Sequence, residues 1–227
     1  MKQLILDISP IQSPSFNNFV AGRNVELLLM LQSIATTALQ ERFVYIWGAS
    51  GSGKSHLLKA VVLAAEAAGR EAAYIDSVAQ HAIDPERLEN AIVAVDDVER
   101  FGEEAQIALF NLYNRMREGR GILIVAGPCA PAQLSLRQDL VTRLGWGLVY
   151  QVHGLSDEEK TRALKSHAKE RGFELSGEVA DYLLRHWRRD MASLLAMLDA
   201  LDRYSLETKR PVTVPLLRQV LQPASLG

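Results

Sequence analysis

The chain has a single cysteine, no long apolar run and no excess of either charge. Cys129 alone cannot form a disulfide framework or a cluster of thiolate metal ligands. No apolar run approaches the roughly 20 residues of a membrane-spanning helix, and Asp7 and Pro10 interrupt the N-terminal apolar stretch, which excludes a signal-peptide core. With 25 Lys and Arg against 27 Asp and Glu, binding to nucleic acid by bulk charge is disfavoured, although a local basic patch is not. These features favour a protein of the reducing cytoplasm without a membrane contact.

Short apolar runs of β type alternate with amphipathic stretches through the first 153 residues of the 227-residue chain. This alternation predicts an α/β unit in which helices cover both faces of a buried parallel sheet. The predicted strands are 43–47, 72–75, 91–95, 121–126 and 148–152. The predicted helices are 24–40, with Asn24 as its cap, 55–68 and 103–118.

Beyond residue 154 no β-type run occurs, which predicts a small all-helical unit. Ser156, followed three residues later by Glu159, forms the pattern of a capping box and predicts the start of a helix. Ser176 and Thr213 are further predicted caps, and residues 190–207 form a long amphipathic stretch. The sequence therefore divides into an arm (1–13), an α/β unit (14–153) and a helical unit (154–227).

The strongest signal is a G-x-x-x-x-G-K-S pattern that begins at Gly48. A predicted strand precedes it and a predicted helix follows it, which is the context of a phosphate-binding loop. Lys54 is expected to reach the β- and γ-phosphates, and the Ser55 hydroxyl to ligate Mg²⁺. The alternative is a flexible Gly/Ser loop. The nucleotide-binding residues predicted here are Gly48, Ser50, Gly51, Ser52, Gly53, Lys54, Ser55 and His56.

The predicted strand 91–95 ends in two acids, Asp96 and Asp97. A buried strand that ends in this way places carboxylates beside a metal held by the loop. We predict that Asp96 holds Mg²⁺ and that Asp97 orients an attacking water. The alternative is a strand end that becomes polar where it reaches the surface.

These features resemble the AAA+ ATPases of the DnaA family. Three further stretches carry the resemblance: Pro14–Val20, Asp139–Leu148 and His186–Met191. In that family the first stretch wraps the adenine, which implies nucleotide contacts for Phe19 and Val20. The second carries an arginine finger, here Arg143, that reaches the ATP of a neighbouring subunit. The third carries the sensor 2 arginine of the lid, here Arg189, with Arg188 as its competitor.

Arg143 also has an explanation other than an arginine finger, and the end of the fourth predicted strand departs from the family pattern. Arg143 has the alternative of a helix-surface arginine, or of an ion pair with Asp139 at helical spacing. The fourth predicted strand ends in Ala126, Gly127 and Pro128, where the family has a polar sensor 1 residue that positions the attacking water. This departure implies weak intrinsic ATPase activity and favours a loop that holds ADP or ATP as a conformational switch.

The arm contains a peptide that resembles the docking motif of replication proteins for the DNA polymerase III β sliding clamp: Gln3, Leu4, Leu6 and Ile8. An extended peptide can place apolar side chains in a pocket while the glutamine anchors it by hydrogen bonds. Asp7 stands where the family often has proline. The alternative is an N-terminal strand added to the sheet.

The chain ends soon after the lid-like helices, so we expect no DNA-binding domain. The resemblance implies a regulator of chromosomal replication initiation that holds ADP or ATP with Mg²⁺, docks on the clamp and promotes hydrolysis of DnaA-bound ATP. The expected partners are DnaA and the β sliding clamp, with DNA contacted through the clamp, and head-to-tail self-association stays open. The alternatives are a helicase loader or initiator-type ATPase acting on DNA, and a P-loop kinase of a small molecule.

Overall fold

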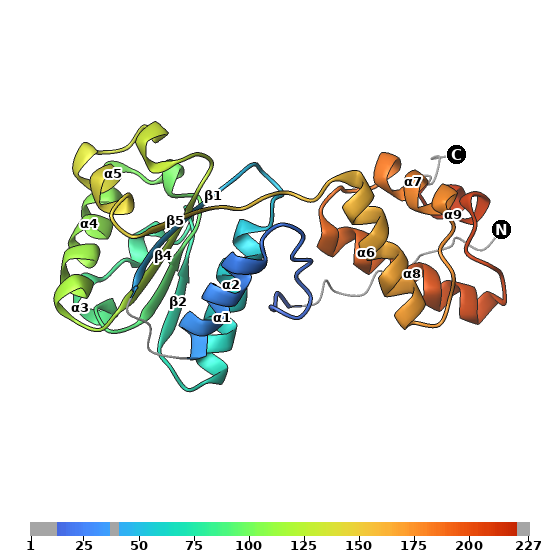
Figure 1. The fold of residues 1–227 in the computed structure, drawn as a ribbon, viewed down its shortest axis with the longest axis horizontal. Helices are drawn as coiled ribbons and strands as arrows, with labels where there is room; N and C mark the ends of the chain where they lie inside the picture. The colour runs from blue at the N-terminus through green and yellow to red at the C-terminus, as the bar shows by residue number, and fades with distance from the viewer. Residues whose placement is uncertain (1–12, 37–40, 222–227) are drawn as a thin grey trace. The chain divides into compact units, whose positions relative to one another are not determined.

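The structure is a computed structural model in which residues 13–36 and 41–221 are described. The predicted clamp peptide, with Gln3, Leu4, Leu6 and Ile8, lies outside these ranges. The described chain forms two compact units, an α/β unit of residues 14–154 and a helical unit of residues 155–221 (Figure 1). Within the described ranges, no helix combines the length and the apolar character that crossing a bilayer requires.

The α/β unit is built on a five-stranded sheet in which every pairing is parallel, as predicted. The strand order is β2-β3-β4-β1-β5. The inner strands β3 and β4 are buried along their whole length, which explains why their sequences are continuous apolar runs. The strands are β1 (Phe43–Trp47), β2 (Ala72–Ile75), β3 (Ile92–Val95), β4 (Ile122–Gly127) and β5 (Leu148–Gln151).

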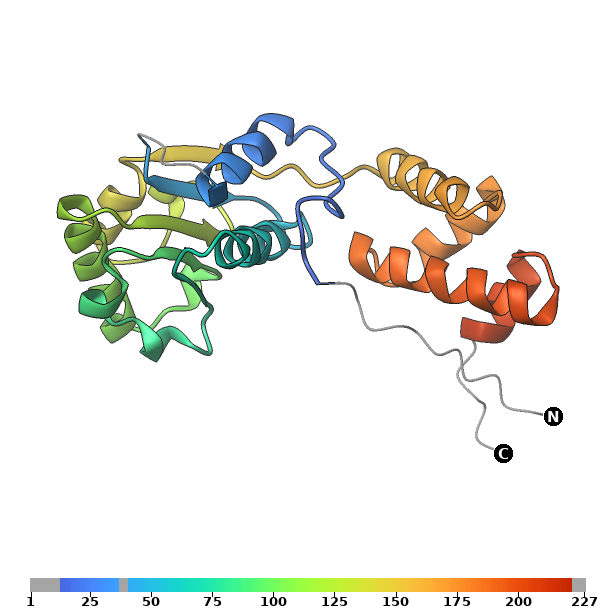
Figure 2. The same ribbon diagram turned by 90° about the horizontal axis from the view of Figure 1, so that it is seen from below.

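Helices cover both faces of this sheet (Figures 1 and 2). Helices α1 and α2 bury their apolar side chains against one face, and α3, α4 and α5 pack against the other. The sequence did not predict α3 and α5, because four and seven residues are too few to show a clear helical periodicity. The helices are α1 (Val25–Thr36), α2 (Lys54–Ala67), α3 (Pro85–Leu88), α4 (Glu103–Glu118) and α5 (Gln138–Leu144).

Asn24 was predicted to cap α1, and for its side chain this prediction is wrong. The backbone carbonyl of Asn24 accepts the first helical bond, from the N–H of Leu28 at 2.9 Å. The buried side chain instead donates from Nδ2 to the carbonyl oxygens of Ala21 (3.0 Å) and His153 (2.9 Å), and its Oδ1 accepts the His153 N–H (2.8 Å). This amide bridge ties the segment before α1 to the chain that leaves β5.

We expect Asn24→Ala to lower the free energy of unfolding by about 2 kcal/mol, because it leaves the half-buried backbone N–H and carbonyl of His153 without their described partners, whereas the Ala21 carbonyl keeps the N–H of residue 24. Urea unfolding measures this change. Ser33→Ala is the matched control, since it removes an exposed bond from the hydroxyl to the Leu29 carbonyl of the same helix and should cost less than about 0.5 kcal/mol. An equally small effect at Asn24 would show that the bridge contributes little.

The C-terminal end of α4 is fixed by an arginine from the chain before β1. Arg42 Nη1 donates to the carbonyl oxygens of Met116 (2.8 Å) and Gly119 (2.7 Å). An α-helix leaves its last carbonyls without helical partners, so a cation at this end both satisfies them and complements the helix dipole.

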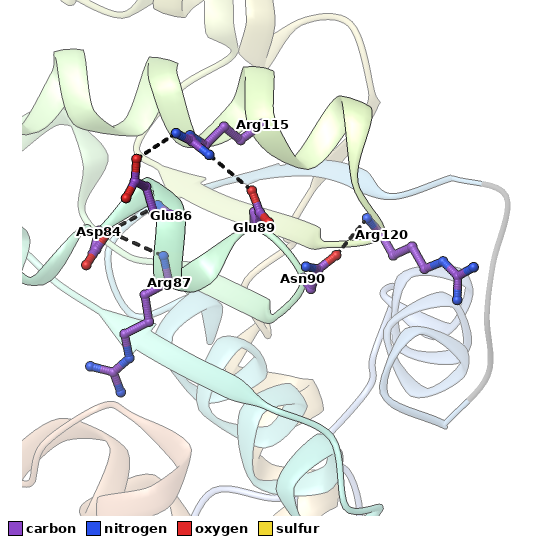
Figure 3. A network of polar contacts seen from close by, with 7 residues as sticks. All are labelled: Asp84, Glu86, Arg87, Glu89, Asn90, Arg115 and Arg120. Atoms are coloured by element: carbon purple, nitrogen blue, oxygen red, sulfur yellow. Dashed lines mark hydrogen bonds and ion pairs between the residues drawn. The ribbon is translucent and has the colours of Figure 1, made fainter.

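A second set of contacts holds α4 against α3 (Figure 3). Arg115 of α4 pairs with Glu86 at 2.8 Å and with Glu89 at 3.3 Å. Asn90 Oδ1 accepts the backbone N–H of Arg120, whose side chain points away from this network. These contacts are exposed, so each stabilises the unit only weakly, and the position of α4 on the sheet is set mainly by its buried apolar face.

In the helical unit, two of the predicted caps bond backbone N–H groups with their side chains. Ser156 and Glu159 form the complete capping box of α6, and the Ser176 hydroxyl accepts a backbone N–H at the start of α7. Asp190, which the sequence did not predict as a cap, caps α8 through its side chain. At the predicted cap Thr213, the described bond is made by the backbone carbonyl, which accepts the first helical bond of α9. The helices are α6 (Asp157–Glu170), α7 (Gly177–His186), α8 (Met191–Thr208) and α9 (Val214–Leu221). Their shared core includes Leu164, Leu183, Leu194, Leu198 and Leu201.

Candidate nucleotide-binding site

The predicted phosphate loop connects β1 to α2, and its backbone requires glycine. Gly51 and Gly53 have φ angles of 76° and 102°, which residues with a side chain rarely adopt. At Gly48 a Cβ would lie 2.4 Å from the carbonyl oxygen of Val152. Lys54, the first residue of α2, folds back over the loop and donates from Nζ to the Gly48 carbonyl at 2.7 Å. The loop therefore has the curled form that presents backbone N–H groups to an anion, with an ammonium group held over it.

Ser52 adds an observation that points to a ligand. The residue is buried, and its Oγ has no hydrogen-bond partner among the described residues. Leaving a buried hydroxyl without a hydrogen bond costs about 1–3 kcal/mol, and a ligand that accepts a hydrogen bond from it would recover this free energy. A phosphate oxygen is such an acceptor, so the loop fits a polyphosphate. The Ser50 and Ser55 hydroxyls belong to exposed residues at the two ends of the loop.

The segment predicted to wrap the adenine lies beside the loop. The Phe19 ring packs against Gly53, where a Cβ would come within 2.7 Å of Phe19 Cε2. The Phe19 ring also lies 5.5 Å from the His56 ring, centroid to centroid. His56 Nε2 is 2.9 Å from the Ser15 carbonyl oxygen, a bond that requires the proton on Nε2. Val20 is half-buried in the same segment.

Asp96 follows β3 as a buried carboxylate with a donor at each oxygen. The Tyr74 hydroxyl of the neighbouring strand donates to Oδ2 at 2.8 Å, and the Asp97 N–H donates to Oδ1 at 3.0 Å. Burial, together with the bond to Asp96, raises the pKa of Tyr74, so the phenol keeps its proton and remains a donor. Asp97 itself has a left-handed backbone, and its Oδ2 lies 3.7 Å from Arg100.

The Asp96 carboxylate fits a magnesium ion that takes some of its other ligands from the phosphates of a nucleotide. In the part of the chain that the structure describes, no three His, Cys, Asp or Glu side chains converge on a metal position. Mg²⁺ commonly takes one or two protein oxygens and fills its remaining positions with waters and phosphate oxygens. Asp96 and Ser55 could supply the protein oxygens beside a nucleotide.

At Gly127, the absence of a polar sensor 1 residue has a packing reason. A Cβ at Gly127, the last residue of β4, would lie 2.1 Å from the Tyr45 hydroxyl oxygen. That hydroxyl donates to the Cys129 carbonyl at 2.8 Å. Because the tyrosine occupies this space, position 127 accepts only glycine, which explains the lack of a polar side chain at that position and not at Ala126 or Pro128.

Arg143 lies at the opposite end of the sheet from the loop. Arg143 and Leu144, at the end of α5, line a small cavity with Phe43 and Val44 at the start of β1. The loop follows Trp47 at the other end of the same strand, about 13 Å further along. The structure therefore does not bring Arg143 and the loop together.

Arg143 forms no ion pair with a carboxylate of the described residues. The predicted alternative, an ion pair with Asp139, is not formed, because Asp139 pairs with Arg137 at 2.8 Å. That bond lowers the pKa of the Asp139 carboxyl. Arg143 Nε is buried and has no acceptor among the residues described. Its guanidinium is surrounded by aromatic rings.

Both arginines predicted for the lid lie in the turn between α7 and α8. Arg189 pairs with Asp157 at the start of α6, and Arg188 Nε lies 3.3 Å from Asp190 Oδ2. Since α7 ends at His186, Arg189 precedes the next helix and is not within it. A contact of Arg189 with the nucleotide stays a prediction.

Comparison with known proteins decides the family. Residues 12–151 match the family model of the bacterial DnaA ATPase domain. The chain belongs to the DnaA family of AAA+ ATPases. Residues 157–221 match the model of the lid domain of Hda, so a DnaA-type α/β unit is followed by an Hda-type lid. A Haemophilus influenzae protein described as uncharacterized is 36% identical over 228 residues, which cover 97% of this chain and 98% of that protein.

Solved structures of DnaA share the fold. Domain III of Thermotoga maritima DnaA aligns with a TM-score of 0.71 at 21% identity, covering 95% of this chain and 100% of that one. AMPPCP-bound DnaA from Aquifex aeolicus aligns with a TM-score of 0.69 at 21% identity, over 87% of this chain and 70% of that one. The predicted AAA+ fold with a helical lid, and the resemblance to the DnaA family, are thus confirmed.

Proposed function

We propose that this DnaA-family chain regulates replication initiation by supplying Arg143 to ATP held by DnaA. The chain would hold an adenine nucleotide in its own loop and dock on the β sliding clamp through its arm. Hydrolysis of the ATP on DnaA would then limit initiation. The alternative of a helicase loader or initiator-type ATPase acting on DNA is an outcome of the test below.

The position of Arg143 is the observation that carries this proposal. The side chain sits at the end of β1 remote from the chain's own loop, and it forms no ion pair with a described carboxylate. A guanidinium with its charge available can stabilise the charge that develops on a transferring γ-phosphoryl group. Its distance from its own loop supports action on the nucleotide of a neighbouring molecule.

The chain's own nucleotide would have a structural role. Lys54, the Ser52 hydroxyl and the backbone N–H groups of the loop would bind the phosphates, while Phe19 and His56 lie where they could contact the base. Bound Mg²⁺, held by Ser55 and Asp96, would screen the phosphate charge. Because the end of β4 has no polar side chain to position water, we expect ADP to persist in the loop and intrinsic hydrolysis to be slow.

A single-turnover assay tests the proposed function. DnaA preloaded with labelled ATP is mixed with the full chain and with β clamp loaded on DNA. We expect faster hydrolysis of the DnaA-bound ATP, and only when chain and clamp are both present. Unchanged hydrolysis by a chain that binds single-stranded DNA without the clamp would contradict the proposal and favour the loader alternative.

The docking step makes a separate prediction about the arm. We expect the double substitution Gln3→Ala/Leu4→Ala to abolish co-elution of the chain with the clamp, because it removes the polar anchor and an apolar contact of the peptide. Nucleotide binding should be unchanged, which is the control for folding. Co-elution that survives the double substitution would place the clamp contact elsewhere.

A further inference from the structure

The guanidinium of Arg143 is held by three aromatic rings, which we call the aromatic cage. Its central carbon lies 4.0 Å from the ring centroid of Trp146, 5.6 Å from that of Phe110 and 5.8 Å from that of Tyr113. All three distances are within the range of a cation–π interaction, and the shortest is to tryptophan, the strongest partner for a cation. Trp146 therefore makes the closest contact of the cage.

The backbone that carries Trp146 is fixed. The Trp146 N–H donates to the Arg143 carbonyl at 3.1 Å, which closes the last turn of α5. The next residue, Gly147, packs so closely on β1 that a Cβ there would lie 2.0 Å from the Phe43 carbonyl oxygen. Because the turn is held at both points, the indole is attached to a defined position beside the guanidinium.

The rear of the cage is equally well supported. The Tyr113 ring packs on the Phe43 ring at a centroid distance of 4.2 Å, and Tyr113 is buried. Phe110 and Tyr113 both belong to α4, whose C-terminal end is fixed by Arg42. Trp146, in contrast, is 56% exposed and forms the outer wall of the cage.

An aromatic cage orients a cation without neutralising it. Arg137, the residue just before α5, is paired with the carboxylates of Asp139 and Glu103. These carboxylates would compete with an incoming anion for the Arg137 guanidinium. Arg143 is held by ring faces, and its buried Nε has no acceptor in the described part of the chain. Its charge is therefore available to an external anion, and its planar group is already ordered before that anion arrives.

We propose that Trp146 is a positioning residue for Arg143, stacking on the guanidinium so that it is presented, still charged, to a polyphosphate held by a partner molecule. This inference rests on the proposed function, in which that polyphosphate is the ATP on DnaA. Loss of the indole leaves the arginine in place but frees its side chain, which lowers the rate of the step it assists and not the stability of the complex.

The test measures the maximal rate of DnaA-bound ATP hydrolysis, and the chain concentration that gives half of it, in the presence of clamp loaded on DNA. We expect Trp146→Ala to lower the maximal rate about tenfold, the worth of one cation–π contact, with a half-saturating concentration within about threefold of wild type. Trp146→Phe retains a ring face and should restore most of the rate. Clamp co-elution and nucleotide binding check that each variant is folded.

A double substitution separates positioning from a general structural effect. In the Arg143→Lys background, where part of the stimulation remains, Trp146→Ala should cause a much smaller loss than in the wild type, because the indole acts by stacking on the planar guanidinium that lysine lacks. If Arg143→Ala abolishes stimulation while Trp146→Ala leaves the maximal rate unchanged or raises it, the inference is overturned and the proposed function stands. If Arg143→Ala itself has no effect, both fail.

Discussion

Arg143→Ala should abolish stimulated hydrolysis of DnaA-bound ATP while the variant folds, binds nucleotide and docks on the clamp as the wild type does. An arginine finger supplied by a neighbouring protein accounts for about 10³–10⁵ in rate, so the expected loss is at least about 10³-fold. The side chain is half-buried at the end of the sheet remote from the loop, so its removal leaves the residues of the loop untouched. Single-turnover hydrolysis measures the loss.

Arg120→Ala is the matched control for this experiment. Arg120 is an exposed arginine just before β4, and its described hydrogen bond is made by the backbone N–H, which the substitution retains. Its stimulation should equal that of the wild type. Arg143→Lys should be intermediate, since lysine keeps the charge but lacks the planar group that stacks in the cage. Full stimulation by Arg143→Ala would remove the finger assignment.

Lys54→Ala should weaken nucleotide binding by at least about 100-fold, because it removes the ammonium that we expect to pair with the β-phosphate of ADP. In the structure Lys54 Nζ also donates to the Gly48 carbonyl, so the substitution removes a contact that helps to hold the loop closed. Displacement of a fluorescent ADP analogue measures the affinity.

Lys59→Ala serves as the control, because it removes a positive charge from the same helix but outside the loop. Its ammonium lies over the Tyr74 ring at 4.9 Å, and the residue is exposed. Its affinity for ADP should remain within about threefold of wild type. A Lys54→Ala variant that bound ADP as tightly as this control would show that the loop does not bind the phosphates.

Much of the fold could be predicted because its signals are local. The strands of a sheet buried on both faces are continuous apolar runs, and the loop between β1 and α2 follows a fixed spacing of glycines with a lysine. The caps at Ser156 and Ser176 could also be predicted from the sequence, because each side chain accepts a hydrogen bond from a backbone N–H three residues away.

The rest depended on contacts between distant parts of the chain. Asn24 looked like a cap, but its amide bonds His153, 129 residues further on. Tyr74 was missed as the partner of Asp96, although the register pairs Tyr74 with Ala94 and so places it on the same sheet face as Asp96. Such a register is known only once the strand order is known.

The nucleotide loop and Arg143 show the same division. The pattern at positions 48–55 predicted a phosphate-binding loop at that place. No neighbouring residue, however, indicated that Arg143 lies at the other end of β1 from this loop. The pairing of Asp139 with Arg137, and not with Arg143, depends on side-chain geometry that helical spacing alone leaves open. The sequence therefore showed where the loop and Arg143 lie along the chain, and the structure shows that they lie at different ends of the sheet.

Nucleotide binding by the loop is the claim on which the other steps depend, and calorimetry of the full chain tests it most directly. The protein is first freed of any nucleotide that copurifies, and is then titrated with ADP and with ATP, each with and without Mg²⁺. We expect saturable heat with one nucleotide per chain, and its loss in the Lys54→Ala variant. A folded wild-type chain that gave no heat with either nucleotide, with or without Mg²⁺, would contradict the proposal that this loop binds a polyphosphate.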